Sequence, residues 1–246
     1  TGASEFVREL VKNYLYLVHK EDGLEDVVLS EYSESLADQE SDGFEKYYSQ
    51  KVKLRRVKKP VAHQLRKGRR ELGSLQTTEA EIPVSDLKVK AKEYGVSMTV
   101  FLTAVYLCAV HRTMTRRQEE KPVILMVPVN LRKIFPSDSM LNFFGYIEPG
   151  YQFGEGKDSF EDVLEAVKIY FQENLSKEQM AGRMNELIAI EKHKILKWAP
   201  LELKNRCIRA GAKMAEQEVT AVLSNMSVVK MPEEYAGYIE RFGVYT

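Results

Sequence analysis

The chain has 246 residues, of which 44% are hydrophobic and 29% are charged, and its formal net charge is zero. This composition supplies enough apolar material for one sizeable core or two small ones, and the balanced charge excludes any whole-molecule electrostatic argument for a nucleic acid or an acidic surface as partner. No apolar run reaches the roughly 18 residues that a membrane span needs, and no signal peptide is visible, so we expect a cytoplasmic protein.

The first twenty residues predict one amphipathic helix. Phe6, Leu10, Tyr14 and Leu17 recur at helical spacing and form an apolar stripe. The chain starts without an initiator Met inside this pattern, and residues 242 to 246 stop within a strand-like pattern. We therefore expect a piece of a longer protein, with apolar surface exposed along this helix.

Residues 21 to 76 differ in character from the rest of the chain. Residues 21 to 45 are rich in Asp and Glu, whereas residues 51 to 70 are rich in Lys and Arg. Blocks of like charge are usually solvated, so we expect a long connection between two subdomains, with short helices or strands inside it. The basic block can also contact the phosphates of a cofactor or a nucleic acid. The matched acidic block argues against a nucleic acid, and we expect no such partner.

The pattern becomes regular from Gln76 onward. Thr77 to Val84 alternates like a strand, and Ser85 stands where it can cap a helix that runs to Tyr94. Gly95 ends that helix, and Ser97 begins a second, strongly apolar one. The run from Val123 to Val127 is continuously apolar and bounded by prolines, which is typical of a central strand covered on both faces.

The remaining elements complete a mixed α/β layered domain. The patterns predict a strand over 142–151 that Pro149 interrupts, helices at about 159–175, 177–193 and 198–215, a short buried strand over 219–223, and a small helix from Pro232 through Phe242.

The histidines and cysteines suggest no reactive centre. A Ser-His-Asp or Cys-His site needs a base within hydrogen-bond reach of a nucleophile. Two histidines close predicted helices, one ends the apolar helix and one lies in the basic block, and none follows a strand beside carboxylates: His19, His193, His111 and His63. No Cys/His pair has the spacing of metal ligands. We expect Cys108 and Cys207 to be buried free thiols within helices.

Polar side chains mark the ends of three predicted strands. An arginine directly after a buried strand must keep its charge paired or hydrated, so Arg132 is either a surface residue or a fixed cation that orients a carboxylate in a cleft. Ligand sites in α/β sheets favour strand ends, so these groups are candidates for one crevice. They are Asn130 and Arg132 after the first strand, Asn142 with Phe144 at the start of the second, and Ser224 with Asn225 after the third.

These segments resemble those of a known family. VPVNLRKIFPSDSMLNFFGYIEP resembles the strand–Arg–loop–Asn–Phe stretch of condensation-domain-like acyltransferases, especially bacterial alcohol acetyltransferase relatives. VSMTVFLTAVYLCAV resembles the helix that opens their second half, and VLSNMSVVKMPEEYAGYIERF is similar to their Ser-Asn segment with its Pro-initiated helix. The resemblance runs from Thr1 to about Phe242 and is weak between residues 21 and 76.

The resemblance implies a chloramphenicol-acetyltransferase-like fold of two halves with a tunnel between them. Residues 1–76 would then be the end of the first half and the crossover, and residues 77–246 an incomplete second half. The general base of the family is the second His of a His-His-x-x-x-Asp-Gly motif, and its Asp pairs with an arginine of the second half. Thr1 to Ser4 looks like the stretch that follows this motif, so the motif is expected upstream and is absent from this chain.

The implied roles follow from motif position. Arg132 is the candidate partner of the missing Asp. The candidates for lining the substrate and CoA channel are Asn130, Asn142, Phe144, Ser224 and Asn225.

The expected function is transfer of an acyl group, acetyl in the first instance, from a CoA thioester to a small alcohol or amine acceptor. Acyl-CoA acts as donor substrate, and no permanently bound cofactor or metal is expected. The expected partners are the missing N-terminal half and these substrates. Two alternatives stay open: a carrier-protein-dependent condensation-type acyltransferase, which residues 51–70 would suit by offering a positive docking patch, and a non-catalytic binding member of the fold.

Overall fold

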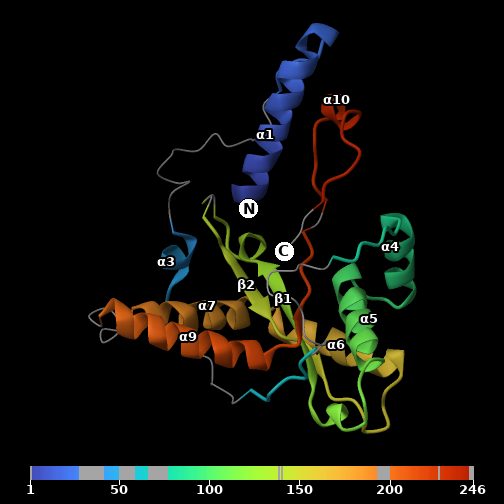
Figure 1. Ribbon diagram of the computed structural model, residues 1–246, viewed down its shortest axis with the longest axis vertical. Helices are drawn as coiled ribbons and strands as arrows, with labels where there is room; N and C mark the ends of the chain where they lie inside the picture. The colour runs from blue at the N-terminus through green and yellow to red at the C-terminus, as the bar shows by residue number, and fades with distance from the viewer. Residues whose placement is uncertain are drawn as a thin grey trace. The chain divides into compact units, whose positions relative to one another are not determined.

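The computed structural model describes residues 2–27, 42–49, 59–65, 77–137, 139, 141–192, 200–226 and 228–243 (Figure 1). These residues form two compact units. The larger unit consists of Tyr48–Leu131 and Phe144–Asn225, and the smaller unit consists of Thr1–Tyr47, Arg132–Phe143 and Met226–Thr246.

The larger unit begins with two helices, α4 (Val84–Glu93) and α5 (Met98–His111). Gly95 adopts a left-handed φ of +65° between them, as predicted. The Ser97 hydroxyl accepts a hydrogen bond from the Val100 N–H at 3.3 Å, so the predicted cap is also confirmed. α5 buries much of its surface, including Phe101, Ala104 and Leu107.

The predicted strand over 77–84 is wrong. Residues 77–83 are exposed and form no strand, because alternation stabilises a strand only where one face is buried against a partner. Ser85 is not the cap of α4 either. Pro83 precedes the helix with a φ of −56°, and the Ser85 hydroxyl donates to the side chain of Asp86 at 3.1 Å instead.

The sheet is built around β1 (Val123–Asn130), which is the central strand that the apolar run predicts. It pairs antiparallel with β2 (Phe144–Ile147) and with β3 (Gly150–Tyr151), and parallel with β4 (Ala221–Val222). Pro149 separates β2 from β3, as predicted, and its carbonyl accepts the Leu125 N–H at 2.9 Å. β4 is not buried, because it pairs with β1 alone among the described strands and leaves Val222 55% exposed.

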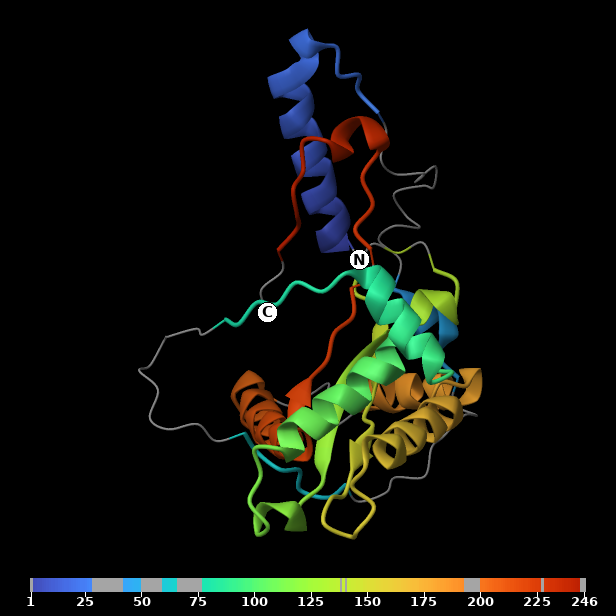
Figure 2. The ribbon, with the colours of Figure 1, turned by 90° about the vertical axis from the view of Figure 1, so that its right-hand side faces the viewer.

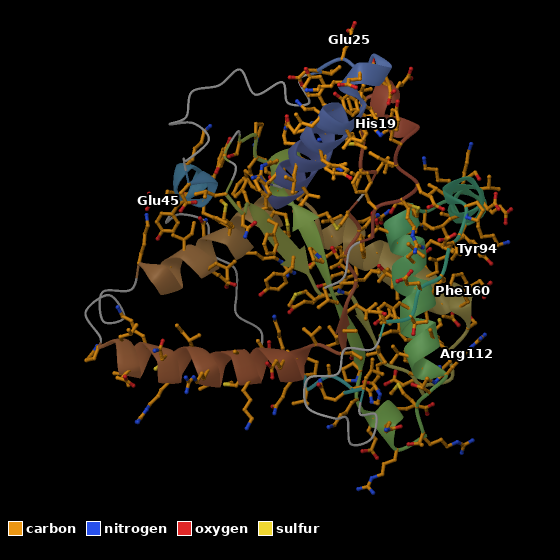
Figure 3. All side chains as sticks on the ribbon, turned by 45° about the horizontal axis from the view of Figure 1, so that its top comes forward. His19, Glu25, Glu45, Tyr94, Arg112 and Phe160 are labelled. Atoms are coloured by element: carbon orange, nitrogen blue, oxygen red, sulfur yellow. The ribbon has the colours of Figure 1, made fainter. Side chains whose placement is uncertain are left out.

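Among the described residues, three helices lie between β3 and β4, as predicted: α6 (Phe160–Asn174), α7 (Lys177–Glu191) and α9 (Leu201–Glu218). Figure 2 shows α5 and α6 packed side by side. At the junction of α4, α5 and α6, the Phe160 ring lies 5.4 Å from that of Tyr94 and 5.7 Å from that of Phe101, and the first two residues are labelled in Figure 3. A short helix, η2 (Gln118–Glu120), precedes β1. In contrast to α5 and α6, α9 buries none of its residues.

Residues 59–65 tie the connecting segment to the larger unit. The Ala62 N–H donates to the carbonyl of Gln217, and the His63 N–H donates to that of Pro122, each at 2.8 Å. The Lys59 ammonium lies 2.6 Å from a Glu148 carboxylate oxygen. Most of both predicted charge blocks, in 28–41, 50–58 and 66–76, lies outside the described residues.

The smaller unit contains α1 (Gly2–His19), η1 (Lys20–Asp22), α3 (Gly43–Tyr47), η3 (Leu131–Lys133), which begins at the boundary between the units, and α10 (Glu233–Ala236). Its core joins Leu15, Leu24 and the fully buried Tyr235. The predicted helix at 1–20 is confirmed, and so is the exposure of its stripe, with Phe6 at 68%.

The helix predicted from Pro232 begins as expected but ends at Ala236 instead of Phe242. Gly237 follows it and favours a helix poorly. The Tyr238 ring then lies 4.2 Å from that of His19, which is labelled in Figure 3, so this contact takes the place of a further helical turn.

At the coarse level, the predicted mixed α/β class holds, with a small and mainly antiparallel sheet. Both cysteines are free, as expected, but Cys108 is half-buried and Cys207 is exposed, because α9 buries no side chain. Among the described residues, no single helix is long and apolar enough to cross a membrane; α4 and α5 meet that test only together, with an 86° bend between them.

Candidate functional site

The carboxyl end of β1 brings two of the predicted residues together. Asn130 is the last residue of β1, and in the antiparallel register it lies opposite Phe144, the first residue of β2. Both side chains are exposed, Phe144 to 47%. Side chains that face each other across an antiparallel pair lie about 5 Å apart at Cβ, so this amide and this ring share one surface.

Two more predicted residues follow β4 toward the same end of the sheet. β4 runs parallel to β1 with Leu125 beside Ala221, and the Leu223 N–H donates to the Met126 carbonyl at 2.9 Å. Because parallel strands share their direction, Ser224 and Asn225 leave β4 at the end where Asn130 leaves β1. Both side chains are exposed. We call this surface the polar sheet end: Asn130, Phe144, Ser224 and Asn225, all in the larger unit.

The first turn of α5 contributes to the polar sheet end. The Asn225 side-chain amide donates to the Thr99 hydroxyl at 3.1 Å. Thr99 is the second residue of α5, whose N-terminus carries a partial positive charge. No sequence pattern points to Thr99 itself, although the capping residue Ser97 marks this helix start and the strand-end rule indicates Asn225.

Two histidines of the larger unit lie away from the polar sheet end. His111 ends α5, twelve residues beyond Thr99, which corresponds to about 18 Å along a helix. Its Nε2 lies 2.9 Å from a Glu119 carboxylate oxygen, and its ring stacks on that of Phe153 at 4.0 Å. Neither its position nor its partners suit a base at the polar sheet end.

His63 lies beside the opposite end of β1. Its backbone is bound to Pro122, just before the strand begins, and β1 extends for about 25 Å from there. Burial lowers the pKa of His63, and the positive charge of Lys121 lowers it further. His193 lies outside the described residues. The larger unit, as far as it is described, thus offers hydrogen-bond donors at the polar sheet end and no imidazole there.

Arg132 lies in the smaller unit, where it organises a loop. Its guanidinium donates to the carbonyls of Ser139 at 2.6 Å and Leu141 at 2.7 Å, and more weakly to that of Phe143 at 3.5 Å. These contacts hold the backbone on both sides of Asn142, whose side chain is exposed. Arg132, the cation predicted after the first strand, is therefore oriented by the loop that carries Asn142.

An aromatic cluster anchors the other side of this loop. Phe143 is buried, and its ring lies 5.0 Å from that of Phe44 in an edge-to-face arrangement. The Tyr47 ring lies 5.2 Å from that of Phe135, and the Tyr47 hydroxyl donates to the Pro136 carbonyl. The loop from Arg132 to Phe143 is thus held by α3 as well as by its own arginine.

Within the described residues, no group of three or more His, Cys, Asp or Glu side chains could hold a metal ion. No protein-family model, curated protein or solved structure matches this chain. Any proposal of function therefore depends on the arrangement of residues within each unit and on the resemblance of sequence segments.

Proposed function

We propose that this chain is part of an acyltransferase that moves an acyl group, acetyl in the simplest case, from a CoA thioester to an alcohol or amine. The observation that supports this most is that Asn130 and Phe144 pair at one end of the sheet and that Ser224 and Asn225 follow β4 toward the same end. The resemblance assigns these four positions to the channel for the acyl group and pantetheine. We likewise propose the two-half chloramphenicol-acetyltransferase-like fold for the complete protein.

The chemistry of the polar sheet end suits a thioester. In the proposed reaction, the acceptor oxygen or nitrogen attacks the thioester carbonyl carbon, its proton passes to a base, and the carbon–sulfur bond breaks to release CoA. Hydrogen-bond donors that face the carbonyl oxygen stabilise the developing negative charge. The Ser224 hydroxyl and the Asn225 amide are donors of this kind, and they can also bind the amides of pantetheine.

The base in this proposal comes from a His-His-x-x-x-Asp-Gly motif outside the chain. The positions of His111 and His63, away from the polar sheet end, support a base from elsewhere. Arg132 is the proposed partner of the motif Asp. A guanidinium carries five N–H donors, so contacts with loop carbonyls are compatible with a carboxylate partner and would aim the charge toward it.

Binding of acetyl-CoA, measured by isothermal titration calorimetry, tests the role of the polar sheet end. We expect Asn225→Ala to weaken binding by about tenfold, the usual size for loss of one or two hydrogen bonds to a ligand. Asn205→Ala removes an exposed amide from α9 and serves as the matched control, with affinity unchanged. Equal affinity for wild type and Asn225→Ala would exclude this surface as the donor site.

The same titration with the acyl group on a phosphopantetheine carrier protein distinguishes a CoA-dependent enzyme from the alternative, a carrier-protein-dependent acyltransferase. Binding of the carrier-linked thioester without binding of free acetyl-CoA would indicate a condensation-type enzyme. Binding of neither would favour a non-catalytic member of the fold.

A further inference from the structure

Helix α9 has an apolar side that the rest of the larger unit does not cover. None of its residues is buried. Its four bulky apolar side chains are more than half exposed: Leu201 (71%), Leu203 (52%), Ile208 (67%) and Met214 (65%). A surface helix of a globular protein normally turns such residues toward the core. We therefore expect these side chains of α9 to pack on a surface outside the larger unit.

Three of the four basic residues of α9 lie on one side of its axis. At about 100° per residue, Arg206, Arg209 and Lys213 fall within one arc about 60° wide. The four bulky residues fall outside that arc in two pairs, with Gly211 and Lys204 between the pairs, whereas Glu202, in the first turn, falls inside the arc. A Cβ added to Gly211 would meet no atom within 4 Å, so the apolar side is also open at its middle.

The charge of α9 separates it from the other exposed amphipathic helix. Over its whole length α9 carries four basic and three acidic residues, but the acidic ones, Glu202, Glu216 and Glu218, stand at its two ends, so its middle, Leu203–Ala215, is purely basic. The charged residues of α1, which also exposes an apolar stripe, cancel instead: Glu5, Arg8, Glu9 and Lys12. Cations beside an exposed apolar side are the combination that binds the surface of an anionic bilayer.

α9 is attached to its unit at one end. The Ala62 N–H donates to the Gln217 carbonyl, and the Gln64 side chain donates to the carbonyls of Glu216 and Val219 at 3.3 and 3.0 Å. These bonds satisfy two of the last four carbonyls of α9 and the carbonyl of Val219, which follows it. The preceding turns extend along the periphery of the larger unit, as Figures 1 and 2 show. The attachment thus leaves the apolar side accessible along most of its length.

We propose that α9 binds the surface of an anionic lipid bilayer. The helix lies in the plane of the interface with its apolar side among the headgroups, and Arg206, Arg209 and Lys213 approach the lipid phosphates. This attachment is peripheral, since no part of α9 crosses the bilayer. It is independent of the proposed acyl transfer, which uses the polar sheet end.

Co-sedimentation of the full chain with vesicles tests the proposal. We expect binding to vesicles of phosphatidylcholine with phosphatidylglycerol, little binding to phosphatidylcholine alone, and release at high salt. Arg209→Glu with Lys213→Glu should lower the partition coefficient by at least about tenfold, because repulsion replaces attraction at two positions. Lys88→Glu with Lys92→Glu changes the net charge equally on exposed positions of α4, and we expect its binding within about twofold of wild type.

A thiol on α9 gives a second readout that reports position. In a Cys108→Ala background, the exposed Cys207 is the remaining thiol and lies on the apolar side of α9. Anionic vesicles should slow its reaction with a water-soluble maleimide severalfold, whereas phosphatidylcholine vesicles should not.

Three results would overturn the proposal: equal binding to both kinds of vesicle, equal loss in the α4 control, or unchanged Cys207 labelling in the presence of anionic vesicles. Self-association that Ile208→Ser abolishes, without vesicle binding, would likewise overturn it and assign the apolar side to a second copy of the chain.

Discussion

At the scale of single residues, Arg132 is the side chain that holds the loop from Ser139 to Phe143 in the smaller unit. Its guanidinium holds three carbonyls of one loop. Arg132→Ala leaves these acceptors without their donor, and we expect the smaller unit to lose about 1.5 to 3 kcal/mol of unfolding free energy in urea. Lys133→Ala removes an exposed neighbouring charge and should change stability by less than about 0.5 kcal/mol.

Arg132→Lys distinguishes the shape of the guanidinium from its charge. An ammonium cannot reproduce a planar fork that reaches several carbonyls at once. We expect this variant to lose most of the stability that Arg132→Ala loses. Recovery of wild-type stability in Arg132→Lys would show that charge alone holds the loop.

Tyr235 allows the contribution of one buried hydrogen bond to the stability of the smaller unit to be predicted. It is fully buried, and its hydroxyl donates to the Glu25 carbonyl at 2.6 Å. Tyr235→Phe keeps the ring in the core with Leu15 and Leu24 but removes that bond, so we expect a loss of about 0.5 to 1.5 kcal/mol in chemical unfolding. Tyr235→Ala, which also empties the core, should cost about 3 to 5 kcal/mol.

His63 makes the larger unit sensitive to acid. Its pKa lies below the ordinary 6.5, mainly because of burial and also because of Lys121. The folded state therefore binds this proton less readily than the unfolded chain. Stability is unaffected well above pH 6.5 and falls as the pH drops through 6.5 toward the lower folded value.

His63→Gln should remove this part of the acid dependence. The measurement is the difference in unfolding free energy between about pH 7.5 and pH 5.5, a window that spans the ordinary histidine pKa. Lys121→Ala removes only the smaller cause and should reduce the difference less. An unchanged difference in His63→Gln would contradict the assignment.

At the scale of elements, the pairing of β1 with β3 depends on a glycine. A Cβ on Gly150 would lie 2.8 Å from the Ile124 Cγ1 and 3.1 Å from the Val123 carbonyl oxygen. Gly150→Ala should therefore cost about 1 to 3 kcal/mol in thermal or urea unfolding. At Gly237 the same change meets no atom within 4 Å and should be neutral or slightly stabilising. Similar losses at both positions would show that steric contact is not the cause.

Helices and strands were predictable from sequence where the local pattern of apolar residues matches the burial that the folded chain gives them. The helix that begins after Ser97 has a capping residue and a strongly apolar sequence, and a glycine ends the helix before it. β1 has a continuous apolar sequence with a proline near each end. Residues 77–83 alternate in the same way as a strand, but alternation does not reveal whether a partner strand is present. The exposure of β4 and α9 was unpredictable for the same reason, since burial depends on what the rest of the chain places nearby.

At the scale of the whole molecule, the polar sheet end was predictable only in part. The rule that ligand groups follow buried strands indicated Asn130, Ser224 and Asn225 from their positions in the sequence. The hydrogen bond from Asn225 to Thr99 joins residues 126 positions apart, and no local pattern predicts such a contact. The sequence also indicated Arg132 and Asn142 as candidates for one crevice, but the three carbonyls that hold Arg132 belong to a loop without periodicity, which no local pattern predicts.

The most direct test of the central proposal is CoA release from acetyl-CoA, with an alcohol acceptor, by the complete product of the gene that encodes this chain. We predict acyl transfer that requires the second His of a His-His-x-x-x-Asp-Gly motif directly ahead of Thr1, and that Arg132→Ala lowers by at least about a hundredfold, as expected when a general base is misplaced. A complete product that lacks this motif and transfers no acyl group from CoA or from a carrier protein would contradict the account.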